Sequence, residues 1–151
     1  MNTRNPIEIR ALRILARREH SRRELEQKLS VFAETCGSEV LAGVLDKLEQ
    51  RGFLSEKRVV EQVARVRRSR FGSQRIVHEL KAKGIDRHLI DDILPTLKET
   101  ELEAALNIWR KKFDKSLPRE ERGKQIRFMM NRGFSMETIQ QVIAQADEEG
   151  A

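Results

Sequence analysis

One local arrangement of helices occurs three times in the 151 residues of this chain, and this repetition limits the folds that the chain can adopt. In the second and third occurrences, a helical stretch ends in a glycine and a hydrophobic residue, Gly84-Ile85 and Gly133-Phe134, and an apolar-faced helix comes next. The apolar positions of those two helices share one register, with one threonine replacing an aliphatic residue: Leu89, Ile90, Ile93 and Leu94, and Thr138, Ile139, Val142 and Ile143. The first occurrence is less regular, because its Gly52-Phe53 step closes its last helix. Repeated small helical units stack into an array with a long surface.

The repeat predicts an all-α fold, an elongated tandem array of three three-helix repeats that resemble helix-turn-helix units. No stretch alternates hydrophobic and polar residues with the period of two that marks a strand. We expect the units to cover residues 1–54, 55–97 and 98–151. Because units this short bury little surface by themselves, we also expect neighbouring units to share a hydrophobic core.

Polar residues predict where the helices begin. Asn5 can cap the first helix with Pro6 in its first turn, and Ser21 with Glu24 forms a capping box for the second. Other helices are expected to open at Ser55, Asp86, the segment 116–118 and Ser135. We expect a loop at residues 30–37, and Pro95 just beyond the end of the third helix of the middle unit.

Hydrophobic periodicity predicts which side chains face the core. They are Leu12, Leu15 and Ala16 in the first helix, Val59, Val60, Val63 and Val66 in the fourth, and Trp109, Ile126, Met129 and Met130 in the last unit. Phe71 is also expected in the core, since aromatic side chains are usually buried.

Composition excludes several classes of protein. Charged residues make up 36% of the chain, but the 38% of hydrophobic residues are periodically ordered, so we expect a folded, soluble protein. Cys36 is the only cysteine, which excludes an internal disulfide and a cysteine-based zinc site, and we expect an inert thiol near a loop. No apolar run approaches the roughly 18 residues that span a bilayer. Residues 1–13 lack the apolar core of a secretory leader, so we expect a cytoplasmic protein without a membrane partner.

Positive charge is concentrated in the middle of the chain. Residues 57–83 hold nine Lys and Arg against two Asp and Glu, whereas residues 1–56 hold ten against nine and residues 84–151 hold eleven against thirteen. The excess behind the net charge of +6 therefore lies in one segment. Such a concentration indicates a partner with an acidic or phosphate-bearing surface.

The candidate partner-binding residues lie on this basic segment. Arg67 and Arg70 fall near the edge of the apolar face at the helix end, where they either snorkel and favour the helix dipole or contact a partner. We favour the partner, because basic residues continue on the next helix, where Glu79 can pair with Arg75 and Lys83. The predicted set is Arg65, Arg67, Arg68, Arg70, Arg75, Lys81 and Lys83.

Arginine binds both carboxylate and phosphate, so the basic segment alone does not separate an acidic protein from a nucleic acid. If a unit reads DNA as a helix-turn-helix, residues 73–83 form the recognition helix. Its exposed set is Gln74, Arg75, His78, Lys81 and Lys83. The interleaved aromatic residues of a single-strand stacking platform are missing.

The sequence shows no pattern typical of catalysis. His20, His78 and His88 are far apart without ligand-like spacing, and we expect each at the surface or its boundary. Asp91 and Asp92 are adjacent on a helix and point apart. There is no glycine-rich phosphate loop. We therefore expect no enzymatic activity, no metal and no cofactor.

Three stretches of the chain resemble RecX regulatory proteins. Residues 15–25 (LARREHSRREL) with Lys28-Leu29 are similar to the opening of the family, and residues 52–55 (GFLS) to its hinge into the second unit. Residues 68–76 (RSRFGSQRI), with Leu80 and residues 83–85 (KGI), resemble its most characteristic stretch. The resemblance runs from about Ile9 to Ala146, nearly the whole chain.

The resemblance implies an elongated three-repeat protein that binds the RecA recombinase filament on DNA in recombination and DNA repair. It implies restraint of filament extension, strand exchange and ATP hydrolysis without catalysis. The basic segment would face acidic RecA surface, single- or double-stranded DNA, or both, and we expect a monomer. Two alternatives stay open: a free-standing DNA-binding module, and an adaptor that displays a protein-binding face to another partner.

Overall fold

Nine α-helices and no strand make up the part of the chain that the structure, a computed structural model, describes: residues 5–113 and 121–149. The helices are α1 (Pro6–Arg17), α2 (Arg22–Cys36), α3 (Ser38–Gln50), α4 (Glu56–Arg67), α5 (Ser73–Ala82), α6 (Arg87–Glu99), α7 (Glu101–Lys112), α8 (Arg122–Asn131) and α9 (Met136–Glu149). The predicted all-α fold is confirmed.

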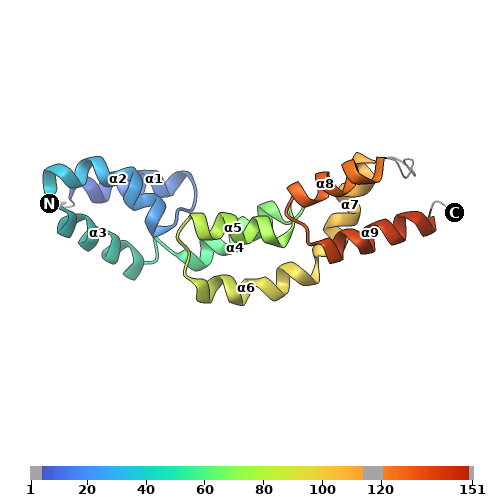
Figure 1. Cartoon of the computed structure of the whole chain (residues 1–151). Coiled ribbons are helices and arrows are strands. Elements are labelled where there is room, and N and C mark those ends of the chain that lie inside the picture. Colours follow the sequence, from blue (N-terminus) through green and yellow to red (C-terminus); the bar gives the residue numbers. More distant parts are fainter. Residues whose placement is uncertain (1–4, 114–120, 150–151) are drawn as a thin grey trace.

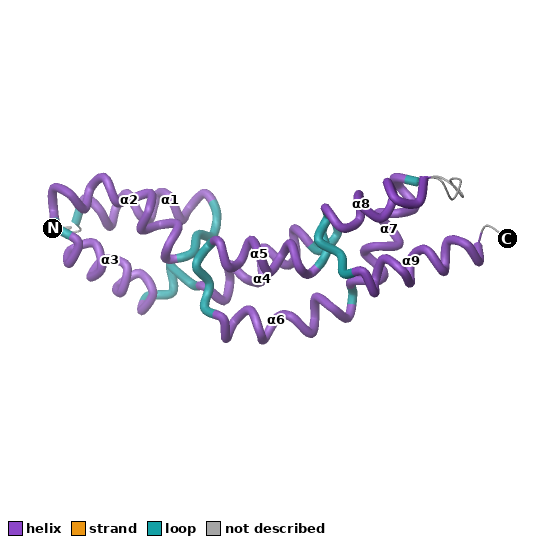
Figure 2. Tube along the Cα trace, in the orientation of Figure 1, coloured by secondary structure: helices purple, strands orange, loops and turns teal. Residues whose placement is uncertain are grey.

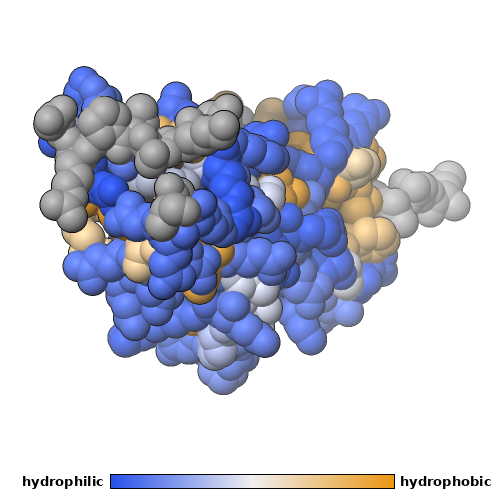
Figure 3. All heavy atoms as spheres, turned by 90° about the vertical axis from the view of Figure 1, so that its right-hand side faces the viewer, coloured by the Kyte–Doolittle hydropathy of each residue, from blue (hydrophilic) through white to orange (hydrophobic). Residues whose placement is uncertain are grey.

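The helices form three groups of three in a row, with the termini at opposite ends of the molecule (Figure 1). Short loops join one group to the next (Figure 2). Hydrophilic side chains cover most of the face seen from the α9 end (Figure 3). The elongated array of three-helix units is therefore confirmed, while the unit boundaries at residues 54/55 and 97/98 stay predictions. None of the helices in the described part of the chain combines the length and the apolar composition of a membrane span.

Each group of helices encloses its own hydrophobic cluster. The buried centres are Leu25, Leu29, Leu45 and Leu48 in the first unit, Val59, Val63, Ile76 and Leu80 in the second, and Trp109, Met129, Phe134 and Ile139 in the third. Full burial of one such side chain stabilises the fold by about 1.5–3 kcal/mol. The expectation of a core shared between units is wrong, because the three hydrophobic clusters are separate and the hydrogen bonds between units join polar groups.

The predicted helix caps are confirmed where the structure describes them. The Asn5 side chain accepts a hydrogen bond from the Ile7 amide (2.9 Å), and Ser21 with Glu24 forms the full capping box. The other confirmed caps are Ser55, Asp86 and Ser135. The expected helix start at 116–118 lies outside the described residues.

The loop expected at residues 30–37 is wrong, because α2 continues through Cys36. Phe32, Ala33 and Cys36 extend the apolar stripe of this helix and pack against the first core. The Cys36 thiol, half-buried in the last turn, donates to the carbonyl of Phe32 (3.0 Å). The helix ends only at Gly37, whose φ of 93° is a conformation that favours glycine.

Pro95 does not follow the third helix of the middle unit but lies inside it, since α6 extends to Glu99. Proline lacks the N–H that would donate to the carbonyl of Asp91. Leu97, which is only 3% exposed, packs into the second core beyond the proline. Burial of this side chain favours continuation of the helix past the missing hydrogen bond.

Three side chains expected in the core lie at the surface. Val66 and Met130 are half exposed and Ala16 is exposed, whereas Trp109 is buried as expected. Val66 lies in the last turn of α4, outside the second cluster. Periodicity thus identifies the face of a helix but not how far along that face the neighbouring helices reach.

Candidate partner-binding site

The second and third units meet backbone to backbone. The Gly72 amide donates to the carbonyl of Arg132 (2.7 Å), and the Gln74 amide donates to the carbonyl of Gly133 (3.2 Å). A Cβ atom on Gly72 would collide with the backbone of Gly133. The C-terminal end of α8 is thereby held against the N-terminal end of α5.

The first and second units also meet at helix ends, but through a side chain. The Ser21 hydroxyl at the start of α2 donates to the carbonyl of Lys83 at the end of α5 (2.6 Å). At both junctions the carbonyl end of one helix therefore faces the amide end of another, which aligns the helix dipoles favourably. The second helices of the three units, α8, α5 and α2, follow one another along the row (Figure 1).

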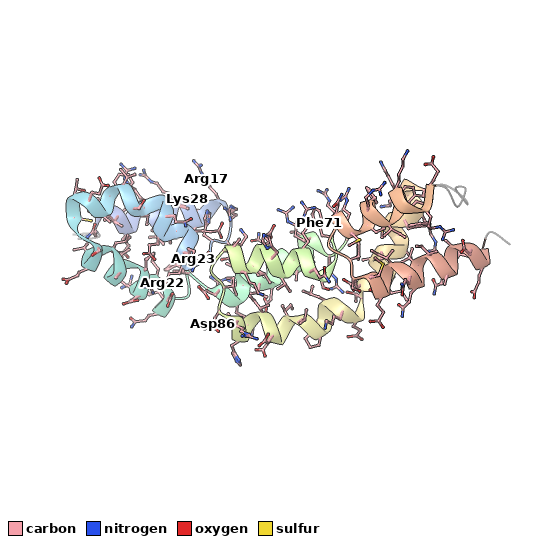
Figure 4. The ribbon with its side chains drawn as sticks, in the orientation of Figure 1. Arg17, Arg22, Arg23, Lys28, Phe71 and Asp86 are labelled. Atoms are coloured by element: carbon pink, nitrogen blue, oxygen red, sulfur yellow. The ribbon has the colours of Figure 1, made fainter. Side chains whose placement is uncertain are left out.

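The junction of the second and third units gathers three arginines around one aromatic ring. The guanidinium carbons of Arg67, Arg75 and Arg132 lie 5.9, 4.1 and 5.4 Å from the centre of the Phe71 ring. Figure 4 places Phe71 at this junction. These four residues, together with Glu79, are called the Phe71 cluster below. Phe71 is only half-buried against the second core, so its predicted core position is correct only in part.

Hydrogen bonds orient the three guanidinium groups. Arg75 donates to the carbonyl of Asn131 (3.1 Å) and Arg132 donates to the carbonyl of Arg70 (3.3 Å), so each bond crosses the junction. Arg67 donates through Nε to Glu79 Oε1 (3.1 Å). The cluster thus presents three cations and one carboxylate, on elements from two units.

Two of the seven predicted residues, Arg67 and Arg75, meet in the Phe71 cluster, and the other five lie elsewhere. The Arg70 side chain is exposed and only its carbonyl takes part, while Arg68 is half-buried at the end of α4. Arg65 is exposed and lines a separate cavity with Arg58 and Arg18 near the first unit.

The other two predicted residues are on the far part of α5. Lys81 is exposed, six positions after Arg75 and therefore about 240° around the helix from it. Lys83 is half-buried and pairs with Glu24 of the first unit (3.1 Å). The expected pairing of Glu79 with Arg75 and Lys83 is therefore wrong. Glu79 pairs with Arg67 of the neighbouring helix, while Arg75 donates to the carbonyl of Asn131 and Lys83 pairs with Glu24.

Glu24 lies at the centre of the junction between the first and second units. It caps α2 and pairs with Arg18 (3.0 Å) as well as Lys83. Burial would raise the pKa of this carboxyl, but hydrogen bonds from the Ser21 amide, Lys83 and Arg18 outweigh burial and lower its pKa from 4.5 to about 2. The charged carboxylate is thus part of what joins the two units.

His20 is buried beside this junction, so its expected surface position is wrong. Lys28 Nζ lies 2.9 Å from His20 Nε2, and His20 Nδ1 lies 2.9 Å from the carbonyl of Arg18. Because an ammonium group can only donate, Nε2 accepts and Nδ1 carries the proton of a neutral ring. Burial, with the charges of Arg18 and Lys28, lowers the pKa of His20 below 6.5. Figure 4 labels Lys28 on α2 of the first unit.

Sequence reasoning missed Arg132, which reaches the cluster from the third unit. It precedes Gly133 as Lys83 precedes Gly84, and both residues occur at the end of the second helix of a unit. That equivalence in the repeat was the available signal, because the Lys83 position also lies at a junction. Lys112, which lies 5.3 Å from the Phe128 ring, extends the basic surface into the third unit.

The charge of the site suits anions. Among residues 5–113 and 121–149, no group of three or more His, Cys, Asp and Glu is placed to hold a metal. A cavity of about 330 Å³ lies beside the cluster, lined by Arg67, Phe71, Arg75, Ile76, His78, Glu79 and Ala82. Guanidinium groups at such a cavity suit carboxylate or phosphate, with which they form paired hydrogen bonds.

Comparisons with known proteins agree with this architecture. Family models for the second and third three-helix domains of RecX match residues 55–94 and 99–143. Regulatory protein RecX of Leptothrix cholodnii is 45% identical, over 93% of this chain and 88% of that protein. Regulatory protein RecX of Herminiimonas arsenicoxydans is 39% identical, over 94% and 93%. The crystal structure of RecX from Lactobacillus salivarius matches with a TM-score of 0.78 at 20% identity, over 93% of this chain and 94% of that one. The chain belongs to the RecX family of regulatory proteins.

Proposed function

We propose that this protein binds the RecA–DNA filament along its length and restrains RecA in recombination and DNA repair. The observation that carries the proposal is the Phe71 cluster, a basic site that two units of an elongated array build together. Membership of a family of regulatory proteins supports a regulatory role, and the resemblance described above connects that role with RecA.

The proposed mechanism is occupancy rather than chemistry. The backbone contact of Gly72 with Gly133 joins the second and third units closely, so the array can contact a filament at several points along its length. Guanidinium groups of the Phe71 cluster hold anionic groups of the filament through paired hydrogen bonds. A protein lying there blocks the addition or movement of RecA subunits and thereby lowers strand exchange and ATP hydrolysis.

Direct DNA binding by the same surface is the second candidate, because arginine also suits phosphate. One feature weighs against sequence-specific reading by α5. Recognition helices contact bases through their N-terminal residues, whereas the start of α5 is covered by the third unit: Gly72 and Ser73 are buried there. The alternative that remains is binding to the DNA backbone, which weakens steeply as salt increases.

Binding to RecA-coated single-stranded DNA and to naked DNA, measured at physiological salt, tests the proposal. We expect tighter binding to the coated DNA and inhibition of the DNA-dependent ATPase of RecA at the same protein concentrations. Equal affinity for both, with ATPase inhibition that follows occupancy of the naked DNA, would support the DNA-binding module. Binding to neither, with recovery of a different protein partner, would support an adaptor.

A further inference from the structure

The basic segment contains only two acidic residues, and they differ in their surroundings. Residues 57–83 hold nine Lys and Arg but only Glu61 and Glu79 as acids. Glu79 pairs with Arg67 inside the Phe71 cluster, at 3.1 Å between Nε and Oε1. Glu61 is exposed on α4 and lines the cavity near the first unit with Arg58 and Arg65, but it forms no ion pair with the residues that the structure describes. A carboxylate therefore already occupies the arginine site.

We propose that Glu79 is an internal counter-ion that holds the place of a partner's carboxylate, and that an acidic side chain of a protein partner displaces it on binding. The proposal deepens the proposed function, because it names the kind of group that the Phe71 cluster takes from the filament. In the free protein the binding site is then occupied by its own Glu79, through one ion pair that a partner can replace.

The accessibility of the ion pair supports exchange. The side chains of Arg67 and Glu79 are 41% and 29% exposed, so solvent and a partner can reach both. Both residues line the cavity of about 330 Å³, which also contains Phe71 and His78 and has room for an incoming side chain. No backbone hydrogen bond has to break when Glu79 moves away.

The donors of the cluster support a carboxylate as the occupant. Glu79 accepts a hydrogen bond from Nε of Arg67. The two terminal nitrogens of Arg67 remain available to another acceptor. A partner carboxylate, free of the helix that constrains Glu79, can form the two-bond arrangement with a guanidinium that is stronger than a single bond. Arg75 and Arg132 remain in place during the exchange, because each is held by a backbone carbonyl across the junction.

The test compares Glu79→Gln with Glu61→Gln as its matched control. Both variants raise the net charge of the same segment by one and keep the shape of the side chain. Since partly exposed ion pairs change binding constants by about two- to fivefold, we expect Glu79→Gln to bind RecA-coated DNA about two- to fivefold more tightly than Glu61→Gln does. The same difference is expected with poly-L-glutamate, which presents carboxylates without RecA, and no such difference is expected with naked DNA.

A second experiment tests whether the increase in affinity depends on Arg67. In an Arg67→Gln background, Glu79→Gln should give no gain, because the ion pair that it releases is already absent. Equal or weaker binding of Glu79→Gln relative to Glu61→Gln, on filaments and on poly-L-glutamate, would overturn the proposal. A gain on naked DNA as large as that on filaments would also overturn it and identify phosphate as the occupant. If the wild-type protein does not bind filaments but Glu79→Gln gains on poly-L-glutamate, the RecA function fails while the role of Glu79 stands.

Discussion

Gly72 and Gly133 lie in direct backbone contact at the junction of the second and third units, although 60 residues of chain separate them. The Gly72 amide also donates a hydrogen bond (2.7 Å) to the carbonyl of Arg132, the residue before Gly133. Because the same junction places Arg132 over Phe71, the closeness of two glycines determines the geometry of the candidate site.

Gly72→Ala is expected to weaken the junction strongly. The added methyl group collides with the Gly133 backbone, which cannot move aside as a flexible side chain could. We expect the free energy of unfolding to fall by more than about 2 kcal/mol. The measurement is chemical denaturation followed by circular dichroism.

Gly43→Ala is the matched control, because nothing lies within 4 Å of a Cβ at this exposed helical position. It should stabilise the protein by about 0.5–1 kcal/mol, since alanine favours a helix over glycine. Equal effects of the two substitutions would contradict the backbone contact at Gly72.

Replacing the three arginines of the Phe71 cluster should weaken binding to the filament. We expect Arg67→Gln, Arg75→Gln and Arg132→Gln together to raise the protein concentration needed for half-inhibition of the RecA ATPase by about tenfold or more, because several charge-assisted hydrogen bonds are lost. The measurement is ATP hydrolysis by RecA on single-stranded DNA, with helicity checked by circular dichroism.

The control for this variant removes the same charge elsewhere. Arg13, Arg51 and Arg87 are exposed and lie outside residues 57–83, so their replacement by glutamine should change inhibition little. If both triple variants inhibit equally, the effect is one of net charge and the Phe71 cluster is not the binding site.

Glu24→Gln should remove a pH-dependent part of the stability. The folded-state pKa of about 2 is below the unfolded value of 4.5, so the charged carboxylate stabilises the fold above pH 4.5 and this contribution is lost as the pH falls toward 2. Neutral glutamine should therefore lower the free energy of unfolding at pH 7 by about 2–3 kcal/mol. Its stability should also change less between pH 4.5 and 2.

Glu26→Gln, at an exposed position on the same helix, is the control for Glu24. Urea denaturation of both variants between pH 2 and 7 provides the measurement. If the free energy of unfolding of Glu24→Gln varied with pH as it does in the wild type, the ion pairs of Glu24 with Lys83 and Arg18 would not contribute to stability.

His20 should make the protein less stable in mild acid. Its folded-state pKa is lowered from 6.5, so at pH values between the two the unfolded chain binds a proton that the folded chain does not. The free energy of unfolding therefore falls as the pH drops below 6.5 and stops falling below the folded-state pKa. Replacing His20 with glutamine should flatten this part of the profile, whereas replacing the exposed His78 should not. The same pH dependence in the wild type and in His20→Gln would contradict the buried neutral ring.

Local sequence signals predicted most of the fold because the forces behind them act within a few residues. The capping box of Ser21 with Glu24 and the cap at Asp86 are contacts of residues two or three positions apart, so they can be read directly from the chain. The expected loop at 30–37 failed because Phe32 and Ala33 gain burial against the first core, and that gain outweighs local preference.

Residue patterns alone predict an all-α chain of three repeated units, with the positive charge in the middle unit and a resemblance to RecX proteins. Which side chains meet across helices and units becomes visible in the three-dimensional arrangement of the helices. Arg132 lies over the ring of Phe71, Lys83 pairs with Glu24, and Arg67 pairs with Glu79. The two residues of each pair are 12 to 61 positions apart in the sequence. Helical periodicity orients a side chain around its own helix, whereas the partner of that side chain depends on how separate helices and units pack together. At the candidate site that docking is governed by the close approach of Gly72 and Gly133.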